Sequence, residues 1–272
     1  MAFIITSYYC HVGGWVLRYV ASYATEPTKV YADPLGYFYA LLGYNAVTGE
    51  TWFPLTAVIF AGIFMGITCF IIVKGVESGI ERFNKIGMPA LFVILIILLI
   101  RALTMPGAGE GLQYMLIPDW SKVTFSTVLS ALGQAFFSLS LGMGCLCTYA
   151  SYFSKNTNLT RTAFSVGIID TFVAVLAGFI IFPAAFSVGI QPDAGPSLIF
   201  ITLPNVFQQA FSGIPILAYI FSVMFYVLLA LAALTSTISL HEVVTAYLHE
   251  EFNFTRGKAA RLVTTGCILL GI

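Results

Sequence analysis

The stretch FFSLSLGMG, residues 136–144, lies inside an apolar run that begins near Val123 and continues past Tyr149. The run is long enough to cross a membrane as a helix. However, Gly142 and Gly144 weaken a helix, and serine hydroxyls can bond to backbone groups or to a ligand. The stretch is therefore either a close packing surface of small residues or a point where a transmembrane helix unwinds around a cavity.

The composition indicates a membrane protein. The chain has 272 residues, of which 59% are hydrophobic and 9% are charged. A soluble domain carries roughly 25% charged residues, so this chain has too few charges to cover a water-exposed surface. The 12 basic and 12 acidic residues balance, and no nucleic-acid partner is expected. No phosphate-binding loop, nucleophile elbow or zinc motif occurs, so the chain is not expected to be an enzyme.

Long apolar segments divide the sequence into about seven candidate membrane spans, each near the ~20 residues that a spanning helix needs. They are residues 1–24, 52–74, 87–106, 124–153, 162–187, 214–248 and 259–272. The runs are too long and uninterrupted for strands. The predicted fold class is therefore an all-α membrane protein, a single transmembrane domain over residues 1–272.

Basic residues concentrate in one set of alternate loops, 74–86, 154–161 and 249–258. Lysine and arginine favour the cytoplasmic side, so the first segment is predicted to run from inside to outside. The opposite loop 188–213 contains prolines but stays apolar, which predicts an extracellular hairpin folded back as a cap. Both chain ends fall inside apolar segments, so we expect a piece of a longer protein.

Two further polar features lie within predicted spans. The stretch ALTSTIS, residues 233–239, places hydroxyls at Thr235, Ser236, Thr237 and Ser239. Hydroxyl and backbone carbonyl oxygens suit a sodium ion without adding net charge. Asp170 lies well inside the fifth segment, where an acid is costly and by default indicates function. Its expected partner is a metal cation or a proton.

Four motifs together resemble the neurotransmitter:sodium symporter family, closest to the bacterial branch for hydrophobic and aromatic amino acids. They are GIERFNKIGMPALF (79–92), FFSLSLGMGCLCTYASYFSK (136–155), IFITLPNVF (199–207) and LAALTSTISLHE (231–242). The resemblance implies a partial LeuT-type inverted-repeat transporter that contains the third to ninth of about twelve helices, one of them unwound at mid-membrane. The missing transmembrane helices would be partners of this chain, and the fragment alone is not expected to transport.

The resemblance also implies the residues of a substrate site. An amino acid would be held by the unwound helix and by apolar neighbours. Tyr9 would bond to the carboxylate of that amino acid. The substrate-binding set is Ile5, Tyr9, Phe137, Ser138, Ser140, Gly142, Met143, Thr237 and Leu240.

Two sodium ions follow from the same resemblance. One would bind the carbonyl of Ala232 and the hydroxyls of Thr235 and Ser236, and the other would bind Ser138, Asp170 and the substrate carboxylate. Asp170 stands where the family commonly has an amide or serine. An internal carboxylate is thought to replace chloride in such relatives, so chloride independence is predicted, with proton countertransport as an open alternative.

Gates on both sides of the site are implied as well. Gln134 resembles an outer-gate residue, whereas Ser151, Tyr152, Glu242 and Glu250 resemble inner-gate residues. The resulting hypothesis is sodium-coupled symport of hydrophobic or aromatic L-amino acids across the plasma membrane by alternating access. The alternatives are a seven-helix membrane receptor and a non-transporting scaffold fragment.

Overall fold

The structure is a computed structural model that describes residues 1–45, 47–75, 80–187, 195–210 and 214–271. Within these ranges the chain is helical, and the only extended pairing is one isolated antiparallel bridge between Tyr44 and Thr51. This confirms the all-α fold class.

The long helices follow the predicted apolar segments closely. In chain order the α-helices are α1 (Ala2–Thr25), α2 (Pro27–Ala32), α3 (Pro34–Leu41), α4 (Leu55–Val73), α5 (Arg82–Leu103), α6 (Ala108–Leu116), α7 (Phe125–Ser138), α8 (Cys145–Ser151), α9 (Leu159–Ser187), α10 (Leu203–Ala210), α11 (Pro215–Glu251) and α12 (Arg256–Leu270). A short 3-10 turn, η2 (Trp120–Lys122), precedes α7, and a π-helical turn, η3 (Leu198–Thr202), precedes α10. Six predicted segments form one long helix each, and segment 124–153 forms two.

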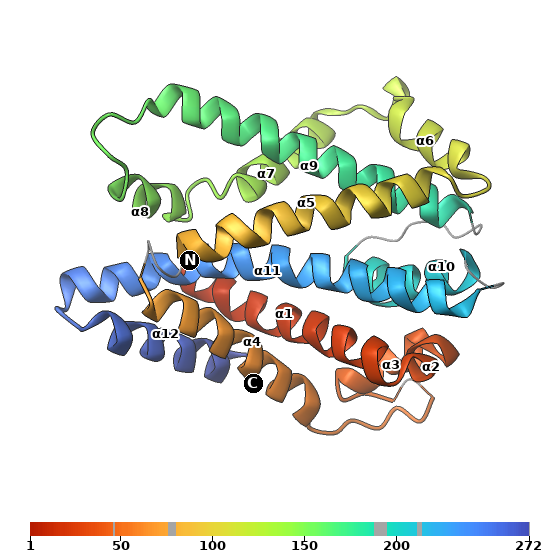
Figure 1. Ribbon diagram of the computed structural model, residues 1–272, viewed down its shortest axis with the longest axis horizontal. Helices are drawn as coiled ribbons and strands as arrows, with labels where there is room; N and C mark the ends of the chain where they lie inside the picture. Colours follow the sequence, from red (N-terminus) through yellow and green to blue (C-terminus); the bar gives the residue numbers. More distant parts are fainter. Residues whose placement is uncertain (46, 76–79, 188–194, 211–213, 272) are drawn as a thin grey trace.

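Four of the helices, α4, α5, α9 and α11, are each long and apolar enough to cross a membrane. Helix α7 is apolar but shorter, because the segment to which it belongs breaks after Ser138. The other long helices, α1 and α12, lie alongside these spans (Figure 1).

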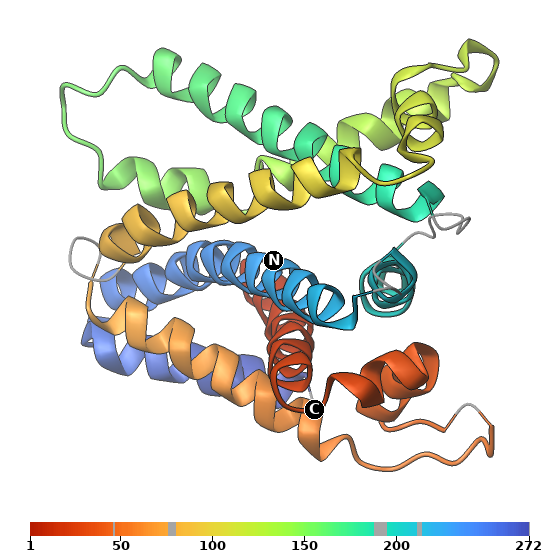
Figure 2. The same ribbon diagram turned by 45° about the vertical axis from the view of Figure 1, so that its right-hand side comes forward.

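The helices form two groups on either side of α5 and α11. Helices α1, α4 and α12 pack with one another and with α11, whereas α6 and α9 pack with each other and α9 with α5 (Figure 1). Figure 2 shows α7 and α9 set apart from α1, α4 and α12. No residue of α7 is buried, and α9 buries residues only near its carboxyl end.

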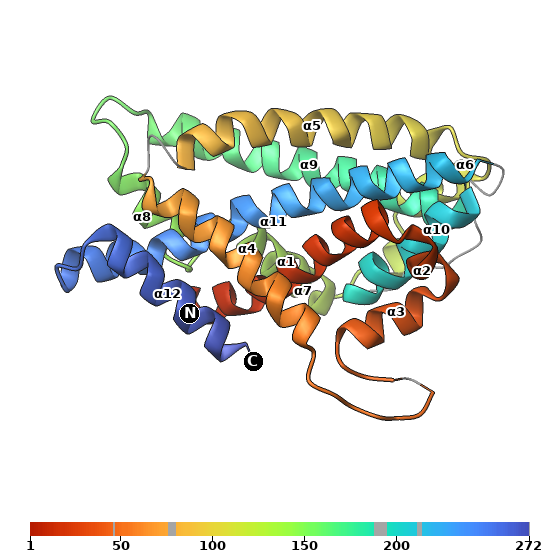
Figure 3. The ribbon, with the colours of Figure 1, turned by 60° about the horizontal axis from the view of Figure 1, so that its bottom comes forward.

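The connections after α4, α8 and α11 lie at one end of the molecule, and those that contain α2, α3, α6 and α10 lie at the other (Figures 1 and 3). The spans therefore alternate in direction as their sequence predicts. The basic loops 74–86, 154–161 and 249–258 gather at one end, although residues 76–79 lie outside the described part.

Glycines let α1 approach α4 closely. A Cβ on Gly14 would lie 2.5 Å from the backbone nitrogen of Ala61, and a Cβ on Gly13 would meet the ring of Phe64. Small residues at a helix contact allow such close backbone approach. This packing fixes α1, whose amino-terminal half carries Ile5 and Tyr9.

Part of the predicted cap, loop 188–213, is described. Its residues 188–194 and 211–213 lie outside the described residues. Between them Phe200 is fully buried, the Tyr19 hydroxyl donates to the Phe200 carbonyl at 3.0 Å, and the Tyr226 hydroxyl donates to the Ile199 carbonyl at 2.7 Å. The turn η3 is therefore bonded to α1 and α11. Its role as an extracellular cap stays a prediction.

Candidate functional site

The helix that contains residues 136–144 is interrupted. Helix α7 ends at Ser138, and α8 begins at Cys145. Between them Ser140, Gly142 and Gly144 have φ values of 53°, 73° and 88°. Backbone in this left-handed region does not continue an α-helix, and it is uncommon for a serine. The prediction of an unwound segment is confirmed in this geometry, and a continuous helix with a small-residue packing face is not what forms.

A cavity of 560 Å³ opens beside this break. Its walls come from α1, α5, the end of α7, the link 139–144, α8, α9 and α11. The predicted site residues that line it are Ile5, Tyr9, Gln134, Phe137, Ser138, Ser140, Met143, Asp170, Thr235, Ser236 and Leu240. Predicted site residues from four helices and one link, far apart in the sequence, therefore meet at one place.

Three of the predicted substrate and sodium residues are not among the described residues that line this cavity. Gly142 is exposed in the link between α7 and α8. Ala232 lies on α11, one turn before Thr235 and Ser236. Thr237 is fully buried, and its hydroxyl donates to the Ala233 carbonyl at 2.7 Å. Thr237 is thus not among the described residues that line this cavity, and its place in the substrate site stays a prediction.

Ser138 and Asp170 join α7 to α9 at the cavity. The Ser138 hydroxyl lies 2.8 Å from Oδ1 and 2.7 Å from Oδ2 of Asp170. Among the described residues that line the cavity, Asp170 alone carries a formal charge. The end of the unwound helix and the intramembrane acid are thus in direct contact, and together they present three oxygen atoms to a cation.

The hydroxyls of α11 form a second oxygen-rich group. Thr235 Oγ1 donates to the Ala232 carbonyl at 2.9 Å, Ser239 Oγ donates to the Thr235 carbonyl at 3.0 Å, and the Tyr149 hydroxyl donates to Ser239 Oγ at 3.0 Å. The hydroxyl protons are therefore directed to protein acceptors. The hydroxyl oxygens keep lone pairs, which is the donor set that a hard cation prefers.

The cavity also contains residues that were not predicted. Asn84 and Met88 come from α5, Tyr149 comes from α8, and Ser239 comes from α11. Ser239 was visible as part of the hydroxyl cluster in 233–239. Asn84 was not singled out because the predicted apolar segment began at residue 87, whereas α5 begins at Arg82.

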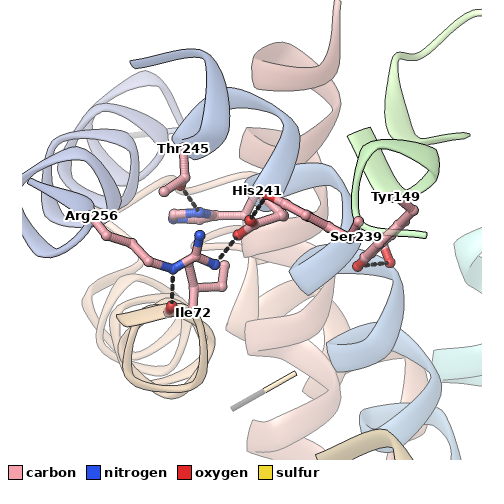
Figure 4. Close-up of polar contacts among 8 residues, drawn as sticks. Ile72, Tyr149, Ser239, His241, Thr245 and Arg256 are labelled. Atoms are coloured by element: carbon pink, nitrogen blue, oxygen red, sulfur yellow. Dashed lines mark hydrogen bonds and ion pairs between the residues drawn. The ribbon is translucent and has the colours of Figure 1, made fainter. Parts of the chain in front are cut away.

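A buried ion pair between Glu242 and Arg256 joins α11 to the start of α12. Glu242 is fully buried, accepts from the Tyr152 hydroxyl at 2.7 Å and pairs with Arg256 Nη2 at 2.7 Å. Arg256 Nε also donates to the Ile72 carbonyl at 2.9 Å (Figure 4). This cluster connects α4, α8, α11 and the start of α12.

The cluster includes two of the four predicted inner-gate residues, Tyr152 and Glu242. The other two lie outside it: Ser151 bonds to the Thr148 carbonyl at 2.7 Å, and Glu250 is exposed near the end of α11. Arg256, which the sequence placed only among the basic loop residues, is the partner that completes the pair.

His241, the neighbour of Glu242, links α11 to α12. Its Nδ1 lies 2.9 Å from Thr245 Oγ1 (Figure 4). Its Nε2 lies 2.9 Å from Thr264 Oγ1. Both ring nitrogens are used in bonds to hydroxyls, so this buried histidine serves helix packing.

A larger hollow of 780 Å³ lies against the exposed face of α9. The described residues that line it are almost wholly apolar, with Phe164, Ile168 and Phe172 among them and Thr171 as their one hydroxyl. It offers no set of polar ligands, so the smaller cavity is the candidate site.

Comparison with known proteins identifies the family. The model of the sodium:neurotransmitter symporter family matches residues 38–272. The chain belongs to this family. It is 41% identical over 270 residues to a sodium-dependent transporter of Haemophilus influenzae and 36% identical over 275 residues to the sodium-dependent transporter YhdH of Bacillus subtilis. These matches cover 99% and 98% of this chain, and 57% and 58% of the relatives.

A solved structure is similar over the same length. The crystal structure of MhsT in complex with L-phenylalanine matches with a TM-score of 0.85 and 40% identity, over 99% of this chain and 59% of that one. The family member described here is thus a multi-pass plasma-membrane protein with a partial LeuT-type transporter fold. It spans a little under three fifths of the length of these relatives, which are transporters and not enzymes.

Proposed function

We propose that this chain forms the central part of a sodium-coupled symporter that carries hydrophobic or aromatic L-amino acids by alternating access. The observation that carries the proposal is the single cavity that brings together the helix break, the Ser138–Asp170 pair and the hydroxyls of α11. A cation and a zwitterionic amino acid both need such groups inside a membrane.

The substrate end of the cavity is proposed to lie where apolar side chains surround the helix break. Met143 and Leu240 are buried together, with Ile5 and Tyr9 packed against them. Phe137 also lines the cavity. An apolar wall with a few polar groups suits a hydrophobic or aromatic side chain. The similarity to a protein solved with L-phenylalanine supports this substrate class.

Sodium is proposed to bind at two places. One ion uses the carbonyl of Ala232 with Thr235 and Ser236, and the other uses Ser138, Asp170 and the substrate carboxylate. The donor atoms fit sodium because they are all oxygens, and among the described residues that line the cavity only Asp170 carries a formal charge. A substrate carboxylate that ligates the ion makes the two affinities depend on each other by the same factor.

Chloride is proposed to be unnecessary because Asp170 already supplies a negative charge beside the ion. In this scheme the carboxylate and the sodium ion neutralise each other within the cavity. A chloride ion from solution would then be repelled by the Asp170 carboxylate at the place where the chloride would bind.

The remaining helices of a longer parent protein are proposed to cover α7 and the amino-terminal part of α9. Exposed apolar side chains, including Phe136, Leu132 and Phe164, lie on these helices. The relatives extend well beyond the matched part. Gln134 is proposed as an outer-gate residue above the cavity, and the Tyr152–Glu242–Arg256 cluster as part of the inner gate.

The direct test is binding by the full-length parent protein in proteoliposomes. Labelled tryptophan, tyrosine and leucine should bind in sodium chloride and not in choline chloride, and a sodium gradient should drive uptake. Binding that is equal in both salts would overturn the proposal. A charged amino acid such as lysine serves as the control substrate and should not compete.

A further inference from the structure

Asn84 places an amide on the wall of the candidate cavity, on a helix to which none of the predicted ligands belongs. It lies in α5, one turn before Met88, and both side chains line the cavity. The Oδ1 atom of Asn84 is buried, and in the part of the chain that the structure describes it has no hydrogen-bond partner.

A buried amide oxygen without a partner is costly, because it has lost its bonds to water and gained nothing in return. The hydrocarbon of a bilayer offers no replacement. Most buried acceptors find a donor on the protein, so the unpaired oxygen of Asn84 indicates a partner that the described residues do not supply.

The neighbouring groups in the cavity favour a cation as that partner. The hydroxyl protons of Thr235 and Ser239 go to carbonyls on α11, and the proton of Tyr149 goes to Ser239. These three side chains therefore turn lone pairs, not protons, toward other groups. Asp170 adds the only formal charge among the described residues of the cavity wall, and that charge is negative.

We propose that Asn84 is a sodium-binding residue, whose amide oxygen adds a ligand from α5 to the hydroxyl oxygens of α11. An amide oxygen is a hard, neutral ligand of the kind that alkali and alkaline-earth cations accept. Because α5 packs against α11, a ligand on α5 makes the bound ion hold these two helices in one arrangement. This inference rests on the proposed sodium-coupled function.

The test uses the full-length parent protein and measures amino-acid binding as a function of sodium concentration. Asn84→Leu keeps the size of the side chain and removes the oxygen. It is expected to raise the half-saturating sodium concentration by about 10- to 100-fold, the range seen when groups that support a metal site are removed. Amino-acid affinity at saturating sodium should stay within about twofold of the unmodified protein.

Two companion variants sharpen the result. Asn84→Asp keeps an oxygen and adds charge, so it should lower the half-saturating sodium concentration. Val93→Leu changes an exposed residue on the same helix that is not among the described residues lining the cavity, and it should leave the sodium dependence unchanged. If Asn84→Leu fails to fold, Asn84→Asp tests the inference alone: a lower half-saturating sodium concentration supports it, and a higher or unchanged one overturns it.

Two results would overturn the inference while leaving the proposed function intact. Sodium dependence that is unchanged in Asn84→Leu or Asn84→Asp would mean that the amide is bonded to protein outside this chain. A loss of amino-acid affinity at saturating sodium, with unchanged sodium dependence, would make Asn84 a substrate ligand. In contrast, a parent protein that binds amino acids without any need for sodium would overturn the proposed function itself.

Discussion

The Ser138 hydroxyl contacts both carboxylate oxygens of Asp170, at 2.8 and 2.7 Å, and so joins the last residue of α7 to the middle of α9. A carboxylate inside a membrane segment requires compensation, and one neutral hydroxyl supplies only part of it. The pair is therefore ready to accept a cation, and it stands where the helix unwinds.

Asp170→Asn tests the role of this carboxylate. The change keeps the shape of the side chain and a hydrogen-bond partner for Ser138. It removes the only formal charge that the described residues place on the cavity wall. We expect the half-saturating sodium concentration for amino-acid binding to rise by about 10- to 100-fold, and added chloride to restore part of the affinity. Binding by the unmodified parent should be the same in chloride and gluconate salts. Unaltered ion dependence in the variant would remove Asp170 from the sodium site.

Much of the fold is predictable from sequence because membrane spans have a simple physical signature. The apolar segments became helices, and the break at 139–144 was visible because two serines and two glycines lie inside an apolar run. Asp170 stood out because charge is rare in such segments. The contact of Asp170 with Ser138, 32 residues apart, was inferred from family resemblance and not from local pattern.

The parts that sequence did not predict depend on helix direction and on helix ends. The sequence places four hydroxyls together, at residues 235, 236, 237 and 239. In the structure Thr237 is fully buried and is not among the described residues that line the cavity. Asn84 lies beyond the apolar run yet inside α5, so hydropathy placed it in a loop. Arg256 was one of several basic residues at the same end, and only the tertiary packing selects it as the partner of Glu242.

Gly144 is expected to be the more sensitive of the two glycines in the link. Both Gly142 and Gly144 have positive φ, so alanine at either position costs about 1–2 kcal/mol of unfolding free energy. A Cβ on Gly144 would also lie 3.0 Å from Val243 Cγ1, whereas a Cβ on Gly142 meets nothing within 4 Å. Thermal unfolding of Gly144→Ala and Gly142→Ala should show the larger loss in Gly144→Ala. Combining Gly144→Ala with Val243→Ala should recover the difference, and equal losses would contradict this account.

The contact between α1 and α4 gives a second matched pair of glycines. Gly14→Ala places a Cβ 2.5 Å from the backbone nitrogen of Ala61. Because the backbone of α4 cannot move aside easily, the unfolding free energy is expected to fall by about 1–3 kcal/mol. Gly62→Ala adds a methyl group where nothing lies within 4 Å, so it should be neutral or slightly stabilising through helix propensity. Both are measured by thermal unfolding in detergent. A neutral Gly14→Ala would mean that α1 and α4 pack less closely.

The pair Glu242–Arg256 is expected to show strong coupling. Arg256→Met leaves the fully buried Glu242 without its cation. Breaking a buried ion pair in this way lowers the unfolding free energy by about 3–5 kcal/mol. Glu242→Gln in the same molecule removes the orphan charge and should recover much of that loss. A double-mutant cycle in unfolding free energy measures the coupling. Additive effects would show that the pair contributes little, and Lys258→Met is the control for loss of a nearby exposed base.

Met143 is expected to set the size of the substrate side chain. It is buried beside Leu240 on the cavity wall, and its flexible thioether adapts to irregular shapes. Met143→Phe places a rigid ring at this position and reduces the space for the substrate side chain. A loss of space equal to a methylene group or more changes substrate affinity by about 10-fold. We therefore expect tryptophan affinity to fall by about that factor while leucine affinity is kept or improves, measured by competition binding at saturating sodium. Cys147→Val, an exposed position on α8 outside the cavity, is the matched control. An equal change for both amino acids in Met143→Phe would place the substrate side chain elsewhere in the cavity.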